Sequence, residues 1–416
     1  MQRRIVTGLV TGCLALAACG GTGAVTEPPG VVVLGVDTER ADPQGSPAQV
    51  RALSRAQLDF AVDLYRTLAG TVEGDLALGP GSLHTALSMV RAGARGQTAR
   101  EMDDVLHATA MDGRLHALNN ALDRRLRARS SARGVQLDIA NRVWVDQGLT
   151  VLDTYAQTVA NHYGAGLAEL DIAGDPAGAR TAVNQWVSDV TRDKVPELFP
   201  ADAIDTTTAL VLANALHLDA QWKFPFPPAA TGPQPFLLPD GSVVPVETMR
   251  YDEYLPSGSG PGWSAVRLPY DGEQLSMTVI VPEDLPAFEQ SLDADLLEQV
   301  SASIQDGGIH LSLPRFTART HVSLVDALAA LGMPNAFGAG ADFSGMTGSR
   351  GLFLSAVEHE VVVEVDEQGT EAAAASGAAM AGSHGPTVSV DRPFLFLVQD
   401  AETDATLFLG RVTDPR

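Results

Sequence analysis

A long connection rich in small residues, between two strand-like runs near the carboxyl end, most constrains what this chain can fold into. Val361–Val365 is mostly β-branched and Phe394–Val398 is apolar, so each run is typical of a strand. The connection between them is far longer than a hairpin needs, and loops beyond about 15 residues in compact domains are usually functional or disordered. Residues 372–381 of this connection hold seven alanines.

A helix is the first alternative for this segment, because alanine has the highest intrinsic helix propensity. However, the segment has no apolar stripe with which a helix could dock, and Gly377 interrupts it. A run of alanines also buries too little surface to fix itself on a core. The pattern therefore favours a loop that can become a strand.

The amino terminus is typical of an export signal. Arg3 and Arg4 precede an apolar stretch, residues 5–18, which is shorter than the roughly 20 residues of a membrane span. Leu16–Cys19 resembles a bacterial lipobox, which predicts that residues 1–18 are a signal peptide and that Cys19 carries a lipid. A plain secretory signal cleaved near Ala18 is the alternative. We expect an exported protein, lipid-anchored at the outer face of the cell membrane or secreted.

Composition limits the chemistry of the mature chain. The 416 residues are 45% hydrophobic, enough for a large core, and length alone allows one to three domains. Cys13 and Cys19 are the only cysteines, so the folded body has no disulfide and no cysteine metal site. Removing residues 1–18 leaves 26 basic against 51 acidic side chains, a net charge of −25. This charge argues against nucleic acid as a partner and leaves lipid as the means of membrane contact.

Residues 19–48 are rich in Gly, Pro, Thr and Asp, which predicts a flexible tether before a body that spans residues 49–416. The short apolar run Val31–Leu34 inside this tether stays unassigned. The body is expected to begin with a helix near Ser54–Ala69, with Ser54 as its cap.

Four further motifs follow in order along the body. Residues 82–98 carry the pattern Ser-x-x-x-Ala-Leu-x-Met-x-x-x-Gly-Ala-x-x-x-Thr, and residues 184–194 carry Asn-x-x-Val-x-x-x-Thr-x-x-Lys. Residues 137–145 and 212–226 are strand-like, and the second of these runs contains Trp222. With the carboxyl-terminal blocks at 392–396 and 410–415, this order of motifs resembles the serpin family over about residues 50 to 416.

The resemblance implies one mixed domain of the α+β class, with three β-sheets, about nine helices and an exposed reactive-centre loop. It also implies an inhibitor of serine endopeptidases rather than an enzyme. As a suicide substrate, it would trap the protease as a covalent acyl-enzyme while the loop inserts into the central sheet. A monomer without cofactor or metal is expected.

The small-residue segment is similar to the serpin hinge. An inserting strand points alternate side chains into the packed face of a sheet, where large or charged groups would overpack. Thr370, Ala372, Ala374 and Ser376 would face inward, and all four are small; Gly369 would supply backbone freedom. The hinge residues implied by the resemblance are Glu367, Gly369, Thr370, Glu371, Ala372, Ala373, Ala374, Ala375 and Ser376.

The scissile bond implied by the resemblance is Ser383–His384. Counting back from the carboxyl-terminal block favours Gly382–Ser383 instead, and Met380–Ala381 is a third alternative. No Arg or Lys lies between Gly369 and Val390. An elastase-like or subtilisin-like target is therefore favoured over a trypsin-like one, and a cysteine protease stays an alternative.

Two more sites are implied by the resemblance. Ser82, Asn214 and His359 correspond to the polar shutter beneath the strands that must part, and Trp222 corresponds to the breach at the top of the sheet. A buried histidine with hydroxyl and amide partners forms a hydrogen-bonded lock that is costly when half satisfied. Many relatives have a serine at the position of Gly79, so the network is expected to be thinner here.

The remaining sequence patterns give weaker evidence for a function. The helix that contains Arg124, Arg125, Arg127 and Arg129 has a basic face, which is either ordinary solvated surface or a site for sulfated polysaccharides. Motifs for zinc proteases, serine hydrolases, phosphate loops and dinucleotides are missing from the sequence. A non-inhibitory carrier or adhesion module at the cell surface is the rival function, and a serine hydrolase is disfavoured.

Overall fold

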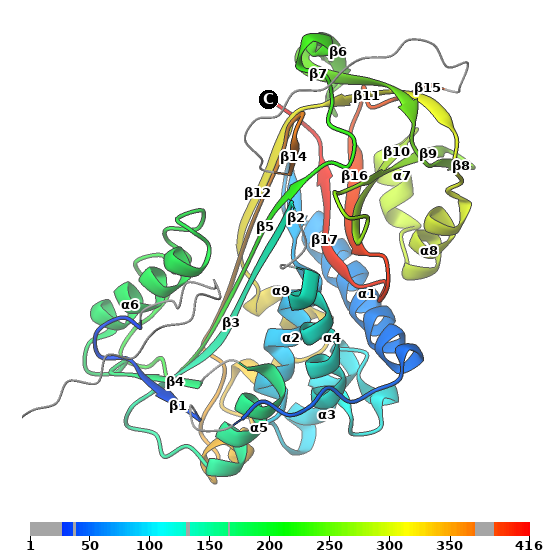
Figure 1. Ribbon diagram of the computed structural model, residues 1–416. Helices are drawn as coiled ribbons and strands as arrows, with labels where there is room; N and C mark the ends of the chain where they lie inside the picture. Colours follow the sequence, from blue (N-terminus) through cyan, green and yellow to red (C-terminus); the bar gives the residue numbers. More distant parts are fainter. Residues whose placement is uncertain (1–26, 36–38, 130–133, 165–166, 371–386) are drawn as a thin grey trace, which may run out of the picture.

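The computed structural model describes residues 27–35, 39–129, 134–164, 167–370 and 387–416, which form ten α-helices and three β-sheets (Figure 1). The expected α+β class with three sheets is confirmed, with one helix more than anticipated. None of the described helices combines the length and the hydropathy of a membrane-spanning segment. The helices are α1 (Pro47–Ala69), α2 (Pro80–Arg91), α3 (Gly96–Val105), α4 (Leu115–Arg129), α5 (Asp153–Tyr163), α6 (Pro176–Val190), α7 (Leu285–Gln290), α8 (Ala294–Ser303), α9 (Val325–Leu331) and α10 (Ser344–Thr347).

The largest sheet, sheet A, has seven strands and runs the height of the molecule (Figure 1). Its long strands β3 and β5 pair antiparallel over their full length, whereas β5 and β13 pair in parallel. In spatial order the strands are β1 (Val32–Leu34), β4 (Leu167–Leu170), β3 (Val135–Asp146), β5 (Leu210–Gln221), β14 (Gly369–Thr370), β13 (Ala356–Val365) and β12 (Phe316–Ser323).

The other two sheets lie at the top and on one side of sheet A (Figure 1). Sheet B consists of β2 (Leu76–Leu78), β17 (Thr406–Val412), β16 (Phe394–Asp400), β10 (Leu275–Pro282), β9 (Trp263–Pro269) and β8 (Ser257–Gly260). Sheet C consists of β15 (Thr387–Ser389), β11 (Gly308–Pro314), β7 (Val243–Tyr254) and β6 (Gly232–Leu237).

The two runs that first drew attention in the sequence thus belong to different sheets. β13 lies in sheet A and β16 lies in sheet B, and the chain between them passes through β15 in sheet C. The connection between the two runs therefore links three sheets.

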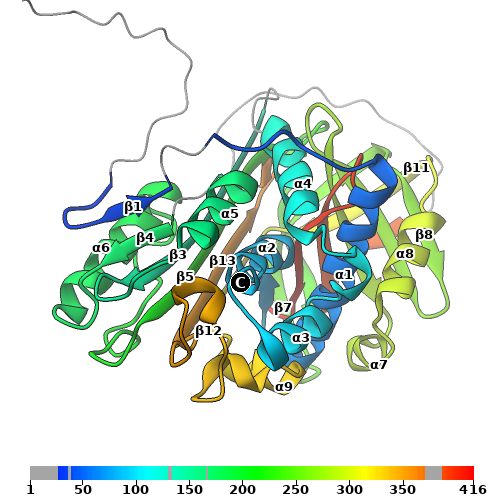
Figure 2. The same cartoon turned by 90° about the horizontal axis from the view of Figure 1, so that it is seen from below.

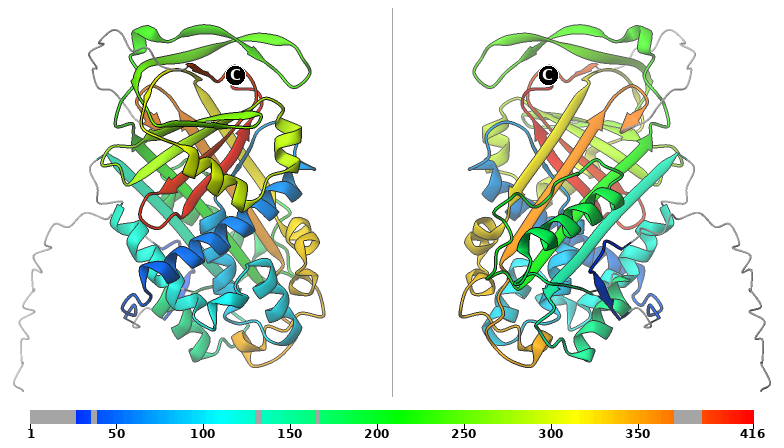
Figure 3. Two further views of the ribbon diagram at one scale, coloured as in Figure 1. Left: turned by 90° about the vertical axis from the view of Figure 1, so that its right-hand side faces the viewer. Right: turned by 90° about the vertical axis from the view of Figure 1, so that its left-hand side faces the viewer.

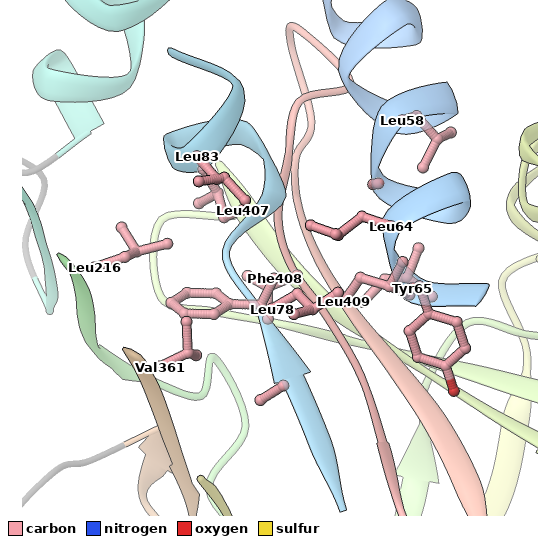
Figure 4. Packing of buried hydrophobic residues seen from close by; sticks show 14 of the residues in the cluster. Leu58, Leu64, Tyr65, Leu78, Leu83, Leu216, Val361, Leu407, Phe408 and Leu409 are labelled. Atoms are coloured by element: carbon pink, nitrogen blue, oxygen red, sulfur yellow. The ribbon is translucent and has the colours of Figure 1, made fainter. Parts of the chain in front are cut away.

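Strand β5 separates two apolar clusters, because both of its faces are buried. Its even-numbered side chains, such as Leu216, join the main core, and its odd-numbered ones, such as Ala215, join a second cluster under α6. Helix α6 crosses the outer face of sheet A, opposite α1–α4 (Figures 2 and 3). In the main core, Leu216 and Val361 lie near Leu83 and Phe408, which come from α2 and sheet B (Figure 4).

The start of α1 differs from the sequence prediction. Its cap is Ser46 rather than Ser54, because Ser46 and Gln49 form a reciprocal capping box, with Pro47 in the first turn. Ser54 lies inside the helix, where its hydroxyl donates to the carbonyl of Val50.

The second half of the predicted tether is also part of the fold. Pro28–Val31 form a turn in which the amide of Val31 donates to the carbonyl of Pro28, and Gly30 has φ +83°. This geometry fits a type II turn, in which proline precedes a glycine of positive φ. The run that the sequence left unassigned becomes β1, which pairs with β4 at the edge of sheet A. The Gly and Pro content that indicated a tether here builds an ordered turn.

Candidate functional site

A two-residue strand occupies the top of sheet A between β5 and β13. Below it, β5 and β13 pair directly, from Val211–Leu216 to Ala356–Val361. Above, Gly369 lies opposite Gln221, and Thr370 bridges β5 and β13. We call Gly369–Thr370 the hinge wedge; sheet A therefore contains the beginning of a central strand but not its continuation at the level of the direct pairing.

The turn that leads into the hinge wedge is stabilised by the side chain of one of its own residues, Asp366. The carboxylate of Asp366 accepts hydrogen bonds from the amides of Gln368 (2.7 Å) and Gly369 (3.2 Å). The amide of Asp366 donates to the carbonyl of Gly369 at 3.0 Å. These bonds reverse the chain at the end of β13, so that the hinge wedge starts downward into the sheet.

Gly369 is required for close approach rather than for an unusual backbone conformation. Its φ is outside the left-handed region in this structure, so the backbone freedom expected at this position stays a prediction. A Cβ atom here would lie 2.0 Å from the carbonyl oxygen of Ala220 and 2.8 Å from Cα of Gln221. Any side chain at this position would push the hinge wedge away from β5.

An aromatic pair holds the second residue of the hinge wedge. Thr370 is buried, and its hydroxyl lies 2.6 Å from the hydroxyl of Tyr270. Tyr270 stacks on Trp222, with ring centroids 4.6 Å apart and planes 10° apart. Trp222 donates from its indole to the carbonyl of Asp366 at 3.0 Å. The predicted breach residue Trp222 therefore contacts both the hinge turn and the residue under the hinge wedge.

Glu367 joins the hinge turn to residues that flank β6 and β11 of sheet C. Its buried carboxylate accepts hydrogen bonds from Arg315 (2.5 and 2.9 Å) and from the hydroxyl of Thr231 (2.5 Å). Burial alone would raise the pKa of Glu367, but Arg315 and Thr231 outweigh it and lower the pKa. Sequence reasoning missed Tyr270, Thr231 and Arg315, although Tyr270 and Arg315 each directly follow a Leu-Pro pair.

The three predicted shutter residues come together at the centre of sheet A. His359 of β13 lies opposite Asn214 of β5, and its Nδ1 lies 2.8 Å from the Asn214 oxygen. The Asn214 amide donates to Ser82 (2.7 Å) and to Asn141 of β3 (2.5 Å). The network thus joins three adjacent strands to α2 just where β5 and β13 pair directly.

The protonation state of His359 follows from its partners. Nε2 accepts from the amide of Gly79 at 3.1 Å, so the single proton of the neutral ring lies on Nδ1 and is donated to Asn214. Burial, helped by the nearby His321, lowers the pKa of His359 from 6.5 to about 4. The ring is neutral at neutral pH.

Two members of this network refine the sequence prediction. The backbone amide of Gly79 donates to His359, so Gly79 belongs to the network although it has no side chain. Asn141 was not predicted as a shutter residue, yet it accepts hydrogen bonds from Asn214 and from Ser82 (3.2 Å). The sequence of β3 contains several polar residues, so only its register with β5, which places Asn141 opposite Asn214, identifies this one.

Several predicted site residues lie outside the described residues. These are the lipidation residue Cys19, the hinge residues Glu371, Ala372, Ala373, Ala374, Ala375 and Ser376, and the alternative scissile residues Met380, Ala381, Gly382, Ser383 and His384.

The basic face of α4 is partly neutralised by the protein itself. Arg124 donates to two backbone carbonyls, Arg127 pairs with Asp123, and Arg129 pairs with Asp400 and Glu402. This favours the ordinary surface interpretation over a polysaccharide site. In the described part of the chain, no three His, Cys, Asp or Glu side chains are grouped to hold a metal ion.

Sequence comparison identifies relatives along nearly the whole body. The family model described as "Serpin (serine protease inhibitor)" matches residues 55–415. The leukocyte elastase inhibitors of Xenopus laevis and Bos taurus are each 34% identical, covering 87% of this chain and 99% of theirs. Iripin-2 of Ixodes ricinus is 34% identical over 86% of this chain and 93% of its own.

Solved structures match the fold. Tengpin, a thermophilic serpin in its native state, superposes with a TM-score of 0.82 at 23% identity, covering 91% of this chain and 97% of its own. Thyroxine-binding globulin in complex with thyroxine superposes with a TM-score of 0.78 at 26% identity, covering 88% and 99%.

Replacing His359 by leucine should separate two roles of this buried histidine. One is its effect on the pH dependence of stability, and the other is its hydrogen bonding between β5 and β13. The folded-state pKa lies below the unfolded value, so the unfolded chain binds more protons between pH 6.5 and 4, and stability falls as the pH falls through this range. His359→Leu should reduce this slope by up to about 1.4 kcal/mol per pH unit. It should also cost about 1–3 kcal/mol at pH 7, because Asn214 and the Gly79 amide lose their partner. Denaturant unfolding as a function of pH measures both.

His84 provides a matched control. Burial also lowers its pKa to about 4, but its ring bonds the carbonyl of Leu106 and does not link β5 to β13. His84→Leu should reduce the pH slope equally while leaving β5 and β13 locked. Faster hydrogen exchange in β5 and β13 is expected in His359→Leu alone. Equal exchange in both variants would contradict the role of His359 in holding β5 and β13 together.

Proposed function

This chain belongs to the serpin family, and we propose that it inhibits a serine protease as a suicide substrate, with the segment between β14 and β15 as bait. The observation that carries the proposal is the hinge wedge, a strand already started between β5 and β13. Relatives named as elastase inhibitors support protease inhibition in general terms. The mechanism and the target are the proposed part.

The register of the hinge wedge predicts the partners of every residue that would follow it. Gly369 opposite Gln221 and Thr370 opposite Ala220 define an antiparallel ladder with β5. Continued downward, this ladder brings Ala374 opposite Leu216, and Ser376 opposite Asn214 of the shutter. Leu216 faces the main core, so Ala374 would enter that core, as Thr370 already does.

Insertion would exchange one parallel ladder for two antiparallel ones. The direct pairing of β5 with β13 spans six residue pairs, and a strand from Gly369 onward could pair with both neighbours along the length of β5. Antiparallel pairing is also slightly more stable per residue than parallel pairing. This gain in strand pairing would drive the loop into the sheet once cleavage frees the carboxyl-terminal end of the loop.

The covalent chemistry belongs to the protease. Its serine hydroxyl attacks the carbonyl carbon of Ser383, an ester bond forms, and the amide bond to His384 breaks. The hydroxyl proton passes through the protease's own base to the leaving amine of His384. Insertion then carries the ester-linked protease along the sheet before water can hydrolyse the ester. The inhibitor contributes a substrate segment and a conformational change. As part of the same proposal, it acts outside the cell, anchored by lipid on Cys19.

Replacing Ala374 by arginine should convert the inhibitor into a substrate. The side chain would have to enter the main core between Leu216 and Val361, where overpacking costs about 1–3 kcal/mol and a buried unpaired charge adds more. Slower insertion lets water hydrolyse the ester first, so the moles of inhibitor consumed per mole of protease should rise about tenfold or more. Titration of an elastase-type protease measures this ratio.

Ala373→Arg is the matched control. The same register directs position 373 to the α6 side, between His217 and Val362, with Asp219 and Glu364 as diagonal neighbours. A long cation at this position can pair with these half-buried carboxylates, one of which already pairs with Lys194, so the ratio should rise several-fold less than in Ala374→Arg. Equal effects of both variants would contradict insertion in this register.

A protease panel should identify the target class and the bond. Small residues and the absence of Arg and Lys before Val390 favour elastase or subtilisin over trypsin, so only the former should give a complex stable to denaturing electrophoresis. Mass spectrometry of the carboxyl-terminal fragment, recovered by denaturation, should show a new amino terminus at His384. Ser383 or Ala381 as the first residue would support the alternative bonds. Cleaved protein should melt at a much higher temperature, and cleavage with neither complex nor stabilisation would refute the mechanism.

A second candidate function is the carriage of a small organic anion. Thyroxine-binding globulin is among the structural matches, and this chain has a cavity of about 770 Å³ between α1, α8 and sheet B. Its lining is apolar at Leu58, Leu275 and Leu297, and Arg267 projects from β9. The lining also contains other charged side chains, namely Arg51, Arg55, Glu273, Glu298, Asp400 and Asp404. Arg267 donates to the carbonyl of Ser301 (3.3 Å), makes no ion pair with the described residues, and has a pKa lowered by burial.

An anionic aromatic dye, 8-anilinonaphthalene-1-sulfonate, tests this second function. Its sulfonate should pair with Arg267, and Arg267→Gln should weaken the dissociation constant by about tenfold or more. Arg350→Gln, which removes an exposed arginine paired with Asp342, serves as the control. Fluorescence titration measures binding, and displacement by thyroxine would extend the result to a natural amphipathic anion. Equal binding by both variants would exclude Arg267 as the anchor.

A further inference from the structure

The amino-terminal residues 27–34, here called the N-terminal clamp, bind the edge of sheet A and α6 together. The turn at Pro28–Val31 leads into β1, whose three residues pair antiparallel with β4. Pro28 is buried, and Val31 packs against the apolar cluster between sheet A and α6. The N-terminal clamp thus contacts both layers on this side of the molecule (Figure 3).

Its strongest contact is a charge pair with β3. Glu27 accepts two parallel hydrogen bonds from Arg142, at 2.6 and 2.9 Å, and Arg142 is only 8% exposed. The guanidinium of Arg142 lies 4.4 Å from the ring centroid of Trp186 in α6 and 5.1 Å from that of Trp144 in β3. Glu27 therefore completes a stack in which one cation joins α6 to sheet A.

The chain after α6 crosses the place where a new strand would enter. Arg192 pairs with Asp138 of β3 at 3.2 Å, and Lys194 lies 3.5 Å from Glu364 of β13. Further along, the carbonyl of Leu198 lies 2.9 Å from Nε2 of His321 in β12. Residues 191–198, here called the crossing segment, therefore span sheet A from β3 to β12 and pass over the β5–β13 boundary.

A strand that enters between β5 and β13 must pass beneath the crossing segment. Its side chains on the α6 side need room there, so the crossing segment has to lift, and α6, to which it is directly joined, has to move relative to β3. The stack of Trp186 on Arg142 opposes this movement, and it depends on Glu27, because a buried guanidinium without its carboxylate is unfavourable.

We infer that the N-terminal clamp sets the rate of loop insertion by holding α6 and the crossing segment on sheet A. This inference rests on the proposed inhibitory function. It assigns a regulatory role to Glu27 and β1, which lie far from the hinge wedge along sheet A (Figure 1). A change that frees the amino-terminal segment would make the inhibitor faster to insert and less durable in its native state.

Glu27→Gln in the full chain tests the inference. The amide keeps the size of the side chain but removes its charge, so hydrogen exchange in α6 should become on the order of tenfold faster. After cleavage of the loop, heat resistance should also appear several-fold faster than in the wild type. Tryptophan fluorescence follows the same step, since Trp186 and Trp144 lie in the stack.

Two variants make the result specific. Glu402→Gln removes another exposed acid paired with an arginine, Arg129, at a site away from α6, and should change neither rate. Glu27→Asp keeps the charge and should restore slow exchange at least in part. If no variant gains heat resistance after cleavage, the inhibitory function itself fails. If all gain it at equal rates, or if exchange in α6 is unchanged in Glu27→Gln, the function stands and the role of the N-terminal clamp is refuted.

Discussion

The direct parallel pairing of β5 with β13 is the interaction on which the rest of the structure depends. Both strands are long and buried, yet they meet along only six residue pairs, and a two-residue strand separates them above. Under the mechanism proposed above, a central antiparallel strand would give the sheet a better pairing, because it would serve both neighbours. The polar side chains that join the two strands would then resist their separation.

These side chains act at three levels of sheet A. At the top, Glu367 and the Trp222–Tyr270 pair hold the hinge turn; at the centre, His359 joins Asn214; at the edge, Glu27 completes the stack on α6. Glu367 and His359 are buried, and Glu27 is an exposed acid that pairs with the buried Arg142; the contribution of each depends on a complete set of partners. Acid weakens two of them: Glu367 loses its charge below its lowered pKa, and His359 must accept a proton that its site disfavours.

The sequence predicted the parts of this arrangement that follow from periodicity. Small residues at every second position from Thr370 to Ser376 indicated an inward face, and Thr370 is indeed buried toward the core. The sequence did not predict three residues of the site, Asn141, Tyr270 and Arg315. Their contacts form only when separate strands come into register. The amino-terminal error has a different cause, since Pro and Gly are equally typical of flexible linkers and of tight turns. Only the pairing of β1 with β4 distinguishes them.

The passage of the chain through three sheets has a consequence for the protein after cleavage. Everything beyond the scissile segment enters β15, β16 and β17, and β16 lies between β10 and β17 with Phe394, Leu395 and Phe396 fully buried. A cut chain is thus a complex of two polypeptides, in which the shorter one completes sheet B of the longer one. This shorter polypeptide would stay bound as part of sheet B, because its release would require the core to open. The cleavage proposed above would therefore use up the inhibitor while the folded molecule stays together.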